Sequence, residues 1–424
     1  MGSECDCFVV PPRNDREFGV LYKRQILTNA PKTAIISNMN KTNKIYLDNA
    51  ATTYVAGEVM AAMMPYFTTE YGNCASLHSF GRAAEKAIAK AREQIAKAIN
   101  AEPNEIYFTS GATEANNWII NGIMERAKVR RALISSIEHP SVIEVGKSLA
   151  ARGYKVEYIK VDKDGIISVA DMVAKLGKPA AVVSIMTANS EVGTIQFLNT
   201  VANIAKERGA LFHTDATQAI GALKIDVKAM NIDALSLSAH KIYGPKGVGA
   251  LYIRNGLNVS KFMLGGGQER GQRSGTVNVP GVVGFGEAVA LTMRDASTNN
   301  ARIRKLRDYL ISEIEAKIDG AKLNGHRTQR LPNNANFSFP GVEGESVMMM
   351  LDFAGIAVST GSACSSGSLE RSHVLRGMGV KDEHNQGSIR FSLGRNTTRE
   401  DIDFTVAELV KVVKKLRSMS AIRG

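Results

Sequence analysis

Several residues whose types could do chemistry follow apolar runs that are typical of strands. Lys241 comes after the run Asp233–Leu237 and opens a loop rich in Gly and Pro, Ser238-Ala-His-Lys-Ile-Tyr-Gly-Pro. A lysine whose pKa is lowered by burial or by nearby positive charge can form a Schiff base with a carbonyl compound. A lysine whose amine reaches the surface gives the same pattern, so the spacing supports both interpretations equally.

Three more strand ends carry residues that suit a phosphorylated, cationic ring. Asp215 follows the run Ala210–His213, and a buried carboxylate there needs a cation such as a protonated pyridine nitrogen. The turn 108–113 leads into a helix whose free amides and dipole favour a phosphate. His139 could stack on a planar cofactor and move protons. The structural alternatives are a helix-capping aspartate, an ordinary strand–helix turn and a structural histidine.

The C-terminal part of the chain adds a cysteine and an arginine. Cys364 lies in a segment rich in Gly and Ser with almost no apolar content, Ser359-Thr-Gly-Ser-Ala-Cys-Ser-Ser-Gly-Ser. Free cysteines are usually buried, so in a polar segment reactivity is the better explanation for the thiol. Arg390, in the apolar run Ser388–Leu393, could clamp a carboxylate through two hydrogen bonds.

The elements that must position these residues form an alternating pattern. From residue 45 on, short apolar runs alternate with amphipathic segments, such as the face formed by Ile88, Ala91, Ile95 and Ile99. This alternation predicts an α/β domain with a largely parallel sheet, whose ligands bind beyond the carboxyl ends of the strands. The predicted strands begin near residues 106, 132, 156, 181, 210, 234 and 248.

The pattern changes after about residue 295. A charged helix over Arg302–Ile318, three short strands and a last helix with the capping box Thr397-Thr-Arg-Glu400 predict a smaller α+β domain. We therefore expect a large cofactor-binding domain over residues 45–295 and a small domain over 296–424 that carries Cys364. Residues 1–44 are expected to be a disordered or targeting tail.

Composition excludes several classes of protein. The 424 residues are 44% hydrophobic and 22% charged with a net charge of +12, and no run reaches the roughly 18 apolar residues of a membrane span. Four cysteines make a disulfide framework improbable. The basic balance suggests an acidic partner, but no nucleic-acid-binding motif accompanies it. We predict a cytoplasmic protein, with a mitochondrion-type organelle as the alternative.

Taken together, the segments resemble the pyridoxal phosphate-dependent cysteine desulfurases of the NifS/IscS type, in the class V aminotransferase family. The resemblance runs from about residue 45 to the C-terminus in the family's order and spacing. It implies the fold of type I pyridoxal phosphate-dependent transferases. The most specific stretches are Tyr46-Leu-Asp-Asn-Ala-Ala-Thr-Thr, Thr109-Ser-Gly-Ala-Thr-Glu, Ser238-Ala-His-Lys-Ile-Tyr-Gly-Pro-Lys-Gly, Arg273-Ser-Gly-Thr and Gly361-Ser-Ala-Cys.

The resemblance also implies roles for individual residues. Lys241 would bind the cofactor covalently, Asp215 would pair with its ring nitrogen, Gln218 with its ring hydroxyl, and His139 would stack on the ring. Asn189 and Arg390 would hold the substrate carboxylate, and Cys364 would accept sulfur. The phosphate would be held by Ala112, Thr113, Ser238, His240 and, from the other subunit of a homodimer, Thr276.

The implied activity converts L-cysteine to L-alanine and leaves a persulfide on Cys364. The implied acceptor is an iron–sulfur scaffold protein, and no intrinsic metal site is expected, although the persulfide could briefly contact an iron–sulfur cluster. Neither a nucleic acid nor a membrane is an expected partner. Two alternatives remain at this point: a related pyridoxal phosphate enzyme, such as a selenocysteine lyase or an aminotransferase, and a basic binding protein without enzymatic activity.

Overall fold

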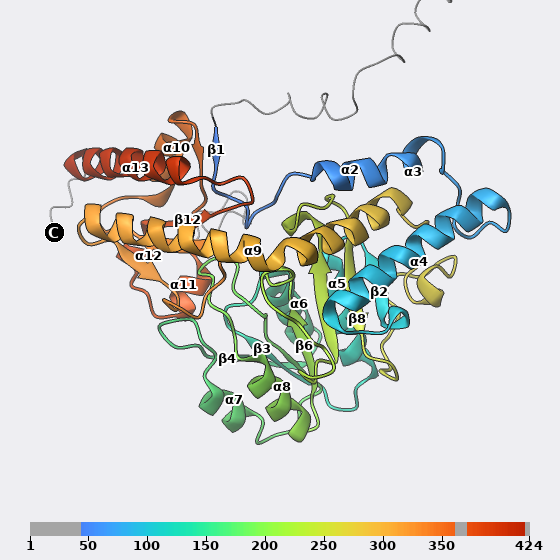
Figure 1. Ribbon diagram of the computed structural model, residues 1–424. Coiled ribbons are helices and arrows are strands. Elements are labelled where there is room, and N and C mark those ends of the chain that lie inside the picture. The colour runs from blue at the N-terminus through green and yellow to red at the C-terminus, as the bar shows by residue number, and fades with distance from the viewer. Residues whose placement is uncertain (1–43, 361–370, 420–424) are drawn as a thin grey trace, which may run out of the picture. The chain divides into compact units, whose positions relative to one another are not determined.

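The computed structural model describes residues 44–360 and 371–419 (Figure 1). Its largest sheet has seven strands in the order β2-β8-β7-β6-β5-β3-β4. Neighbours from β7 to β4 are parallel, whereas β8 pairs antiparallel with both β7 and β2. The predicted α/β class with a mostly parallel sheet is confirmed. The strands are β2 Ile106–Thr109, β3 Arg131–Ser135, β4 Lys155–Ile159, β5 Val182–Ser184, β6 Leu211–Asp215, β7 Ala234–Ser238 and β8 Gly249–Ile253.

Both faces of this sheet are covered by helices. Side chains of β8 alternate between two apolar clusters: Tyr252 packs with residues of α4, α8 and α9, and Leu251 packs with residues of α5 and α6. The face of α4 predicted from the spacing of Ile88, Ala91, Ile95 and Ile99 is buried in the first cluster. The helices are α4 Ser79–Ile99, α5 Ala112–Arg126, α6 Pro140–Ala151, α7 Val169–Lys175, α8 Leu198–Glu207 and α9 Val279–Lys317.

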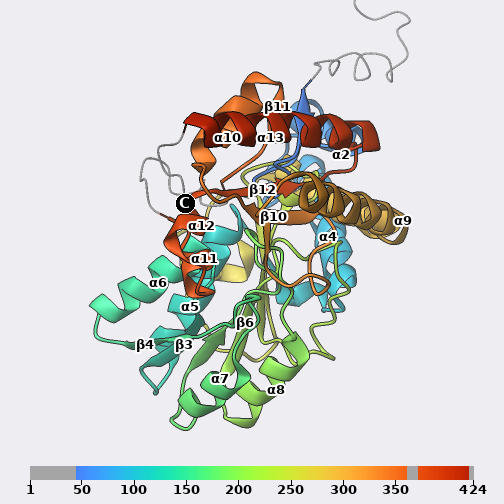
Figure 2. The ribbon, with the colours of Figure 1, turned by 90° about the vertical axis from the view of Figure 1, so that its left-hand side faces the viewer.

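A second group of strands lies in the C-terminal part of the chain. The antiparallel strands β12-β10-β9 form one sheet, and β1 pairs in parallel with β11. The helices α10 and α13 lie beside each other against these strands, with Phe337, Phe391 and Leu409 in the shared core (Figure 2). The bounds are β1 Ile45–Tyr46, β9 Lys322–Asn324, β10 Asn334–Ser338, β11 Ile356–Ala357, β12 Ser388–Ser392, α10 Gly344–Phe353 and α13 Arg399–Met419.

Short helices complete the described part of the chain. Two of them, α2 and α3, precede α4, and two more, α11 and α12, precede β12. None of the helices within residues 44–360 and 371–419 is long and apolar enough to cross a membrane. The bounds are α2 Gly57–Met63, α3 Pro65–Thr68, α11 His373–Gly377 and α12 Asp382–Gln386.

The helix α9 is much longer than the sequence predicts. It runs over 39 residues from Val279, whereas the prediction began at Arg302, so residue 295, the expected end of the large domain, falls inside it. The missed part contains glycines that lower intrinsic helix propensity. They allow close packing instead, because a Cβ at Gly286 would lie only 2.6 Å from the Cα of Ala91 in α4. Tertiary contact therefore outweighs propensity here.

The predicted capping box of α13 is wrong by one residue. Thr397 uses its hydroxyl in the preceding loop and does not pair with Glu400. The reciprocal bonds are made by the next pair: Thr398 Oγ1 accepts from Asp401 N at 3.1 Å, and Asp401 Oδ2 accepts from Thr398 N at 2.9 Å. The sequence holds two overlapping patterns of Thr followed three residues later by an acid, and spacing alone cannot separate them.

Phe391 allows a test of the core beneath α10 and α13. Its side chain is fully buried, so Phe391→Ala should lower the free energy of unfolding by about 3–5 kcal/mol through lost burial and a new cavity. Phe404, which is 47% exposed on α13, is the matched control, and its replacement by Ala should change stability by roughly 0.5 kcal/mol or less. Urea unfolding curves measure both, and equal effects would contradict the described packing.

Candidate active site

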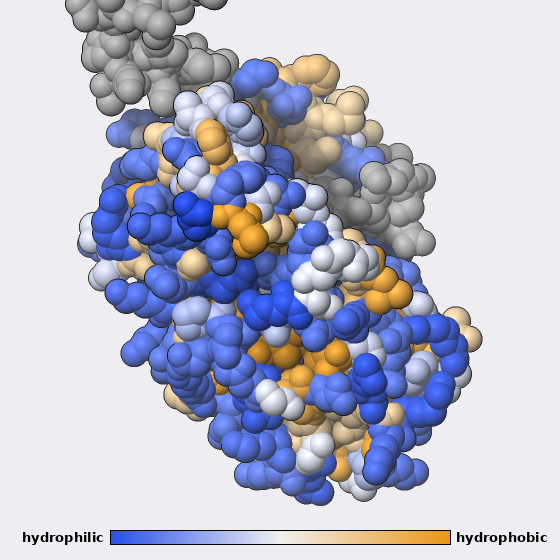
Figure 3. All heavy atoms as spheres, turned by 90° about the vertical axis from the view of Figure 1, so that its right-hand side faces the viewer, coloured by the Kyte–Doolittle hydropathy of each residue, from blue (hydrophilic) through white to orange (hydrophobic). Residues whose placement is uncertain are grey.

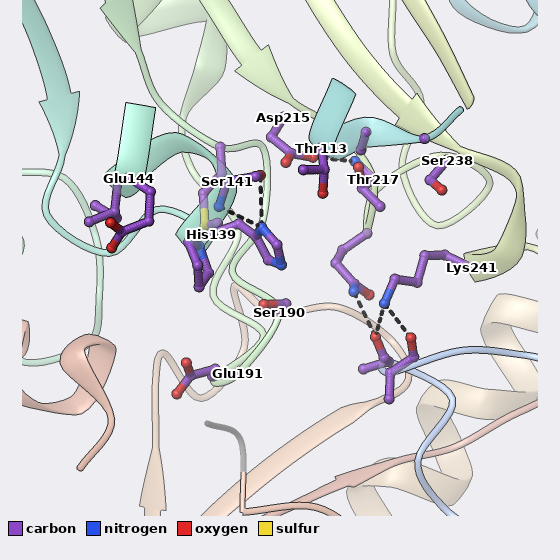
Figure 4. Close-up of a pocket in the computed structure, with 18 of the residues that line it drawn as sticks. Thr113, His139, Ser141, Glu144, Ser190, Glu191, Asp215, Thr217, Ser238 and Lys241 are labelled. Atoms are coloured by element: carbon purple, nitrogen blue, oxygen red, sulfur yellow. Dashed lines mark hydrogen bonds between the residues drawn. The ribbon is translucent and has the colours of Figure 1, made fainter. Parts of the chain in front are cut away.

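A cavity of about 990 Å³ lies beyond the carboxyl ends of β6 and β7. Its walls come from the start of α5, the turn before α6, the loops after β5, β6 and β7, residues 50–52, residues 371–373 and β12. In Figure 4, Asp215, Thr113, Ser238 and Lys241 lie on one side of this space and His139 lies on the other. The sequence-predicted residues that line the cavity are Ala112, Thr113, His139, Asp215, Gln218, Ser238, His240, Lys241 and Arg390.

Lys241 is placed by the short helical turn Ala239–Lys241 that follows β7. Its Nζ donates to the carbonyl oxygens of Ala50 and Ala51, each at 2.6 Å, and Gln218 Nε2 donates to the Ala50 carbonyl at 3.0 Å (Figure 4). Of the two interpretations that the spacing left open, the surface-reaching lysine is not observed, since the amine points into the cavity wall. Carbonyl groups suit an ammonium because they only accept hydrogen bonds.

The start of α5 forms a cradle suited to a phosphate. Ala112 and Thr113 occupy the first positions of this helix, where backbone amides lack intrahelical partners. A Cβ at Gly111 would meet only Ser238 Oγ, at 3.9 Å, so the turn has open space in front of it. Behind the turn, Gly249 is required, since a Cβ there would lie 2.6 Å from the Cα of Gly111. The hydroxyls of Thr113 and Ser238 border the same space.

Asp215 is buried and its carboxylate is held from two sides. Asn116 Nδ2 donates to Oδ2 at 2.8 Å, and the backbone N of Thr217 donates to Oδ1 at 2.9 Å. Beneath it, His213 is fully buried between the hydroxyls of Ser184 and Ser236. Burial lowers the pKa of His213 to about 4, although the Asp215 charge opposes this shift. His213 is therefore neutral at pH 7 and adds no charge beneath Asp215.

His139 forms the opposite wall of the cavity. It is the N-cap of α6, and its Nδ1 accepts from the backbone N of Ser141 at 3.1 Å. Because Nδ1 is an acceptor, the proton of the neutral ring must be on Nε2. Burial lowers the pKa of His139, Asp215 raises it, and the charges of Lys241 and His373 lower it further. A neutral imidazole at this position can stack on a planar ring.

Arg390 lies on β12 and is nearly buried. Its Nη2 donates to Asp48 Oδ1 at 2.8 Å and its Nη1 donates to the Ser190 carbonyl at 3.0 Å. Its Nε is buried without a hydrogen-bond partner among the described residues. A buried guanidinium edge of this kind could bind a carboxylate.

Three site residues predicted from the sequence are not among the described residues that line the cavity. Asn189 is buried beside it, where Nδ2 donates to the Ile137 carbonyl at 2.9 Å and Oδ1 accepts from the backbone N of Glu191 and Val192. Thr276 is exposed in the loop before α9. Cys364 lies outside the described residues. The proposed roles of all three stay predictions.

Sequence reasoning missed several residues at the site. Asn116 and Asp48 hold Asp215 and Arg390, and His373 lines the cavity. Asp48 stands within one of the stretches that carry the family resemblance, which is a signal that could have drawn attention to it. Asn116 lies on the inward face of α5 and His373 follows the cysteine segment, but neither has a spacing that marks it.

Comparisons with known proteins agree with this arrangement. The family model of class V aminotransferases matches residues 45–404. The chain is 48% identical to a cysteine desulfurase IscS of Clostridium botulinum over 386 residues, which cover 90% of this chain and 97% of that protein. The chain belongs to the cysteine desulfurases of the class V aminotransferase family. A second relative, the cysteine desulfurase IscS of Methanosarcina thermophila, is also 48% identical, over 90% of this chain and 95% of its own.

Solved structures of this family have the same fold. A NifS-like protein superposes with a TM-score of 0.83 and 38% identity, covering 88% of this chain and all of that one. SspA in complex with cysteine superposes with a TM-score of 0.75 and 34% identity over 84% of this chain.

Class V aminotransferases depend on pyridoxal phosphate, and the site suits this cofactor. The cradle at α5 suits its phosphate, the carboxylate of Asp215 suits its ring nitrogen, and the amine of Lys241 suits its aldehyde. Among the described residues, no group of three or more His, Cys, Asp or Glu side chains could hold a metal ion.

The low pKa of His213 predicts how stability depends on pH. The unfolded chain protonates this histidine near pH 6.5, whereas the folded protein does so only near pH 4. The unfolded state therefore binds more protons between these values, and the free energy of unfolding should fall as the pH falls through this window. The urea midpoint should drop from pH 7 to pH 5, and it should drop less in His213→Gln. An equal drop in both proteins would refute the assignment.

Proposed function

We propose that the chain uses pyridoxal phosphate to convert L-cysteine to L-alanine and passes the sulfur to Cys364 as a persulfide. The observation that carries this proposal is the convergence of Lys241, Asp215 and His139 with the α5 cradle in one cavity of a cysteine desulfurase. The proposal divides the chain into a cofactor-binding domain over residues 45–295 and a small domain over residues 296–424.

Residues around the cavity would bind the phosphate, the ring nitrogen, the ring face and the ring hydroxyl of the cofactor. The backbone at Ala112 with Thr113, Ser238 and His240 would bind the phosphate, and Asp215 would keep the ring nitrogen protonated. His139 would stack on the ring, and Gln218 would bond its hydroxyl. When bound, the cofactor supplies an electron sink that makes the α-hydrogen of the substrate acidic.

The substrate would be oriented by charge. Arg390 would bind the cysteine carboxylate through its guanidinium, whose Nε has no partner among the described residues. Asn189 would assist, which requires its amide to leave the bonds to Ile137, Glu191 and Val192. Lys241 Nζ would remove the α-proton and act as the general base.

Residues on either side of Cys364 support its role as sulfur acceptor. Ser359 is bonded to the backbone of Arg390 in β12, and Ser372 Oγ donates to Glu191 Oε2 at 2.5 Å. Both Ser372 and Arg390 line the cavity. Cys364 comes four residues after Thr360 in the sequence, a separation that an extended chain spans in at most about 14 Å. The thiolate would attack the substrate sulfur, so that a sulfur–sulfur bond forms and the carbon–sulfur bond of the substrate breaks. The electron pair of the broken bond would stay with the carbon fragment, which takes up protons and leaves as alanine.

A homodimer is part of the proposal, with Thr276 of each subunit completing the phosphate site of the other. Figure 3 shows hydrophobic side chains gathered among hydrophilic ones on the face that includes α3 and α4. The exposed apolar side chains near these helices support an interface, since monomers rarely leave such groups uncovered. They are Phe67, Tyr71, Leu77 and Phe80, exposed by 56%, 68%, 91% and 46%.

The proposed destination of the sulfur is an iron–sulfur scaffold protein. This step rests on the relatives named IscS and on the accessibility that a sulfur donor requires, and the cytoplasm is the proposed compartment. The scaffold would have to reach the persulfide itself.

Replacing Lys241 tests the catalytic proposal. Lys241→Ala should lose the cofactor absorbance and lower alanine formation from cysteine by at least about 100-fold, because the general base is removed. Lys246→Ala is the matched control, since Lys246 also lines the cavity, and it should keep the absorbance and most of the activity. Alanine release and the visible spectrum measure both variants. A Lys241→Ala protein that still turns over cysteine would sink the assignment.

Replacing Cys364 tests the acceptor. Cys364→Ser should retain the cofactor but fail to accumulate a protein persulfide, which mass spectrometry of the intact chain detects as one added sulfur. Cys74→Ser should accumulate the persulfide normally, since Cys74 is not among the residues that line the cavity. Sulfur on the Cys364→Ser chain in wild-type amount would show that another group is the acceptor.

A further inference from the structure

His373 has a defined orientation in the cavity wall. It is the first residue of α11, and its Nε2 lies 2.9 Å from the backbone carbonyl oxygen of Glu138, the residue before His139. A carbonyl oxygen can only accept, so Nε2 carries the proton. The neutral ring then has its lone pair on Nδ1, for which the described residues offer no hydrogen-bond partner. The side chain is half-buried and lines the cavity.

Charged groups surround this imidazole from several elements. The turn before α6 contributes Glu138 and His139, and the loop after β5 contributes Glu191, which is bonded to Ser372. Burial raises the pKa of the Glu138 carboxyl well above its usual range. On the segment of His373 itself, Arg371 and Arg376 are exposed. Acidic side chains, Glu138 and Glu191, and basic side chains, Arg371 and Arg376, are therefore found on the elements next to the His373 ring.

The other nitrogen bases of the cavity are poor proton acceptors. His139 uses Nδ1 to accept from Ser141 and has a lowered pKa. Burial and the charges of Lys241 and Lys246 lower the pKa of His240 to about 4, and its Nδ1 pairs with Thr52 Oγ1. The amine of Lys241 donates to two carbonyl groups. Within the described cavity wall, His373 presents an imidazole Nδ1 whose role as an acceptor is fixed, because Nε2 of the same ring faces a carbonyl oxygen.

The proposed reaction needs such an acceptor. Free cysteine is a zwitterion, and its α-ammonium must lose a proton before its nitrogen can act as a nucleophile. We propose that His373 is a further catalytic residue, whose Nδ1 takes this proton as the substrate enters the cavity. The ammonium N–H bond breaks, its electron pair stays on the nitrogen, and an imidazolium forms; the proton then leaves to water. This inference rests on the proposed function.

Replacement by glutamine separates a proton-accepting role from a structural one. In His373→Gln the side-chain amide can still donate to the Glu138 carbonyl, but no base remains. At pH 7 the kcat/KM for cysteine should fall by about 100-fold. The deficit should shrink as the pH rises, because more substrate then arrives with a free amine. The low-pH part of the activity profile should also differ between the wild type and the variant, because the variant lacks an ionisable group at this position.

The control is His384→Gln on α12, which lies outside the cavity wall and should keep the wild-type profile. A deficit of equal size at every pH would mean a structural role and overturn the inference, as would unchanged activity of His373→Gln. A wild-type protein that releases no alanine from cysteine would instead refute the proposed function. These outcomes are distinct because the wild type is assayed first.

A spectroscopic measurement tests the same assignment without turnover. The ¹⁵N resonances of His373, recorded on the protein freed of cofactor, should show a protonated Nε2 and an unprotonated Nδ1 in the neutral ring. The signal is assigned by its absence from His373→Gln. In a separate activity assay, added imidazole should restore part of the activity of His373→Ala. The opposite tautomer would contradict the proposal even if the substitutions impair folding.

Discussion

The site depends on the backbone of residues 47–53, which is hydrogen-bonded to two separate parts of the fold. On one side, Leu47 O accepts from Ser392 N in β12 at 2.7 Å; on the other, Thr53 N donates to His240 O at 2.9 Å. Between these anchors, the carbonyls of Ala50 and Ala51 hold Lys241. One short segment therefore connects the arginine of β12 with the lysine after β7. We propose that these two residues bind the carboxylate and remove the α-proton of the same substrate.

Burial gives each charge at the site a specific environment. Asp215 accepts hydrogen bonds from two donors, whereas burial lowers the pKa of His139, His213 and His240. Removing these groups from water disfavours additional positive charge near the lysine. The cavity can therefore receive a cationic ring nitrogen beside Asp215 with little competing positive charge from these three histidines. This separation of roles follows from the desolvation of each side chain.

Much of the site could be predicted because strand ends converge in a parallel sheet. Asp215 ends a strand and Lys241 and His139 each follow one, so their common position follows from the alternation of strands and helices. Asp48 could not be found this way, since its bond to Arg390 joins positions 342 residues apart. The carbonyls of Ala50 and Ala51 are equally hidden, because backbone groups leave no mark on the sequence. The early start of α9 was missed because its glycines serve packing.

The central claim is that Lys241 binds the cofactor covalently in this cavity. Borohydride reduction of the holoenzyme fixes pyridoxal phosphate to the amine that holds it, and peptide mapping by mass spectrometry then identifies that amine. Lys147 and Lys246 also line the cavity and serve as internal comparisons. We expect the pyridoxyl group on Lys241 alone. Its presence on Lys147 or Lys246, or on no lysine of the loaded protein, would contradict the account.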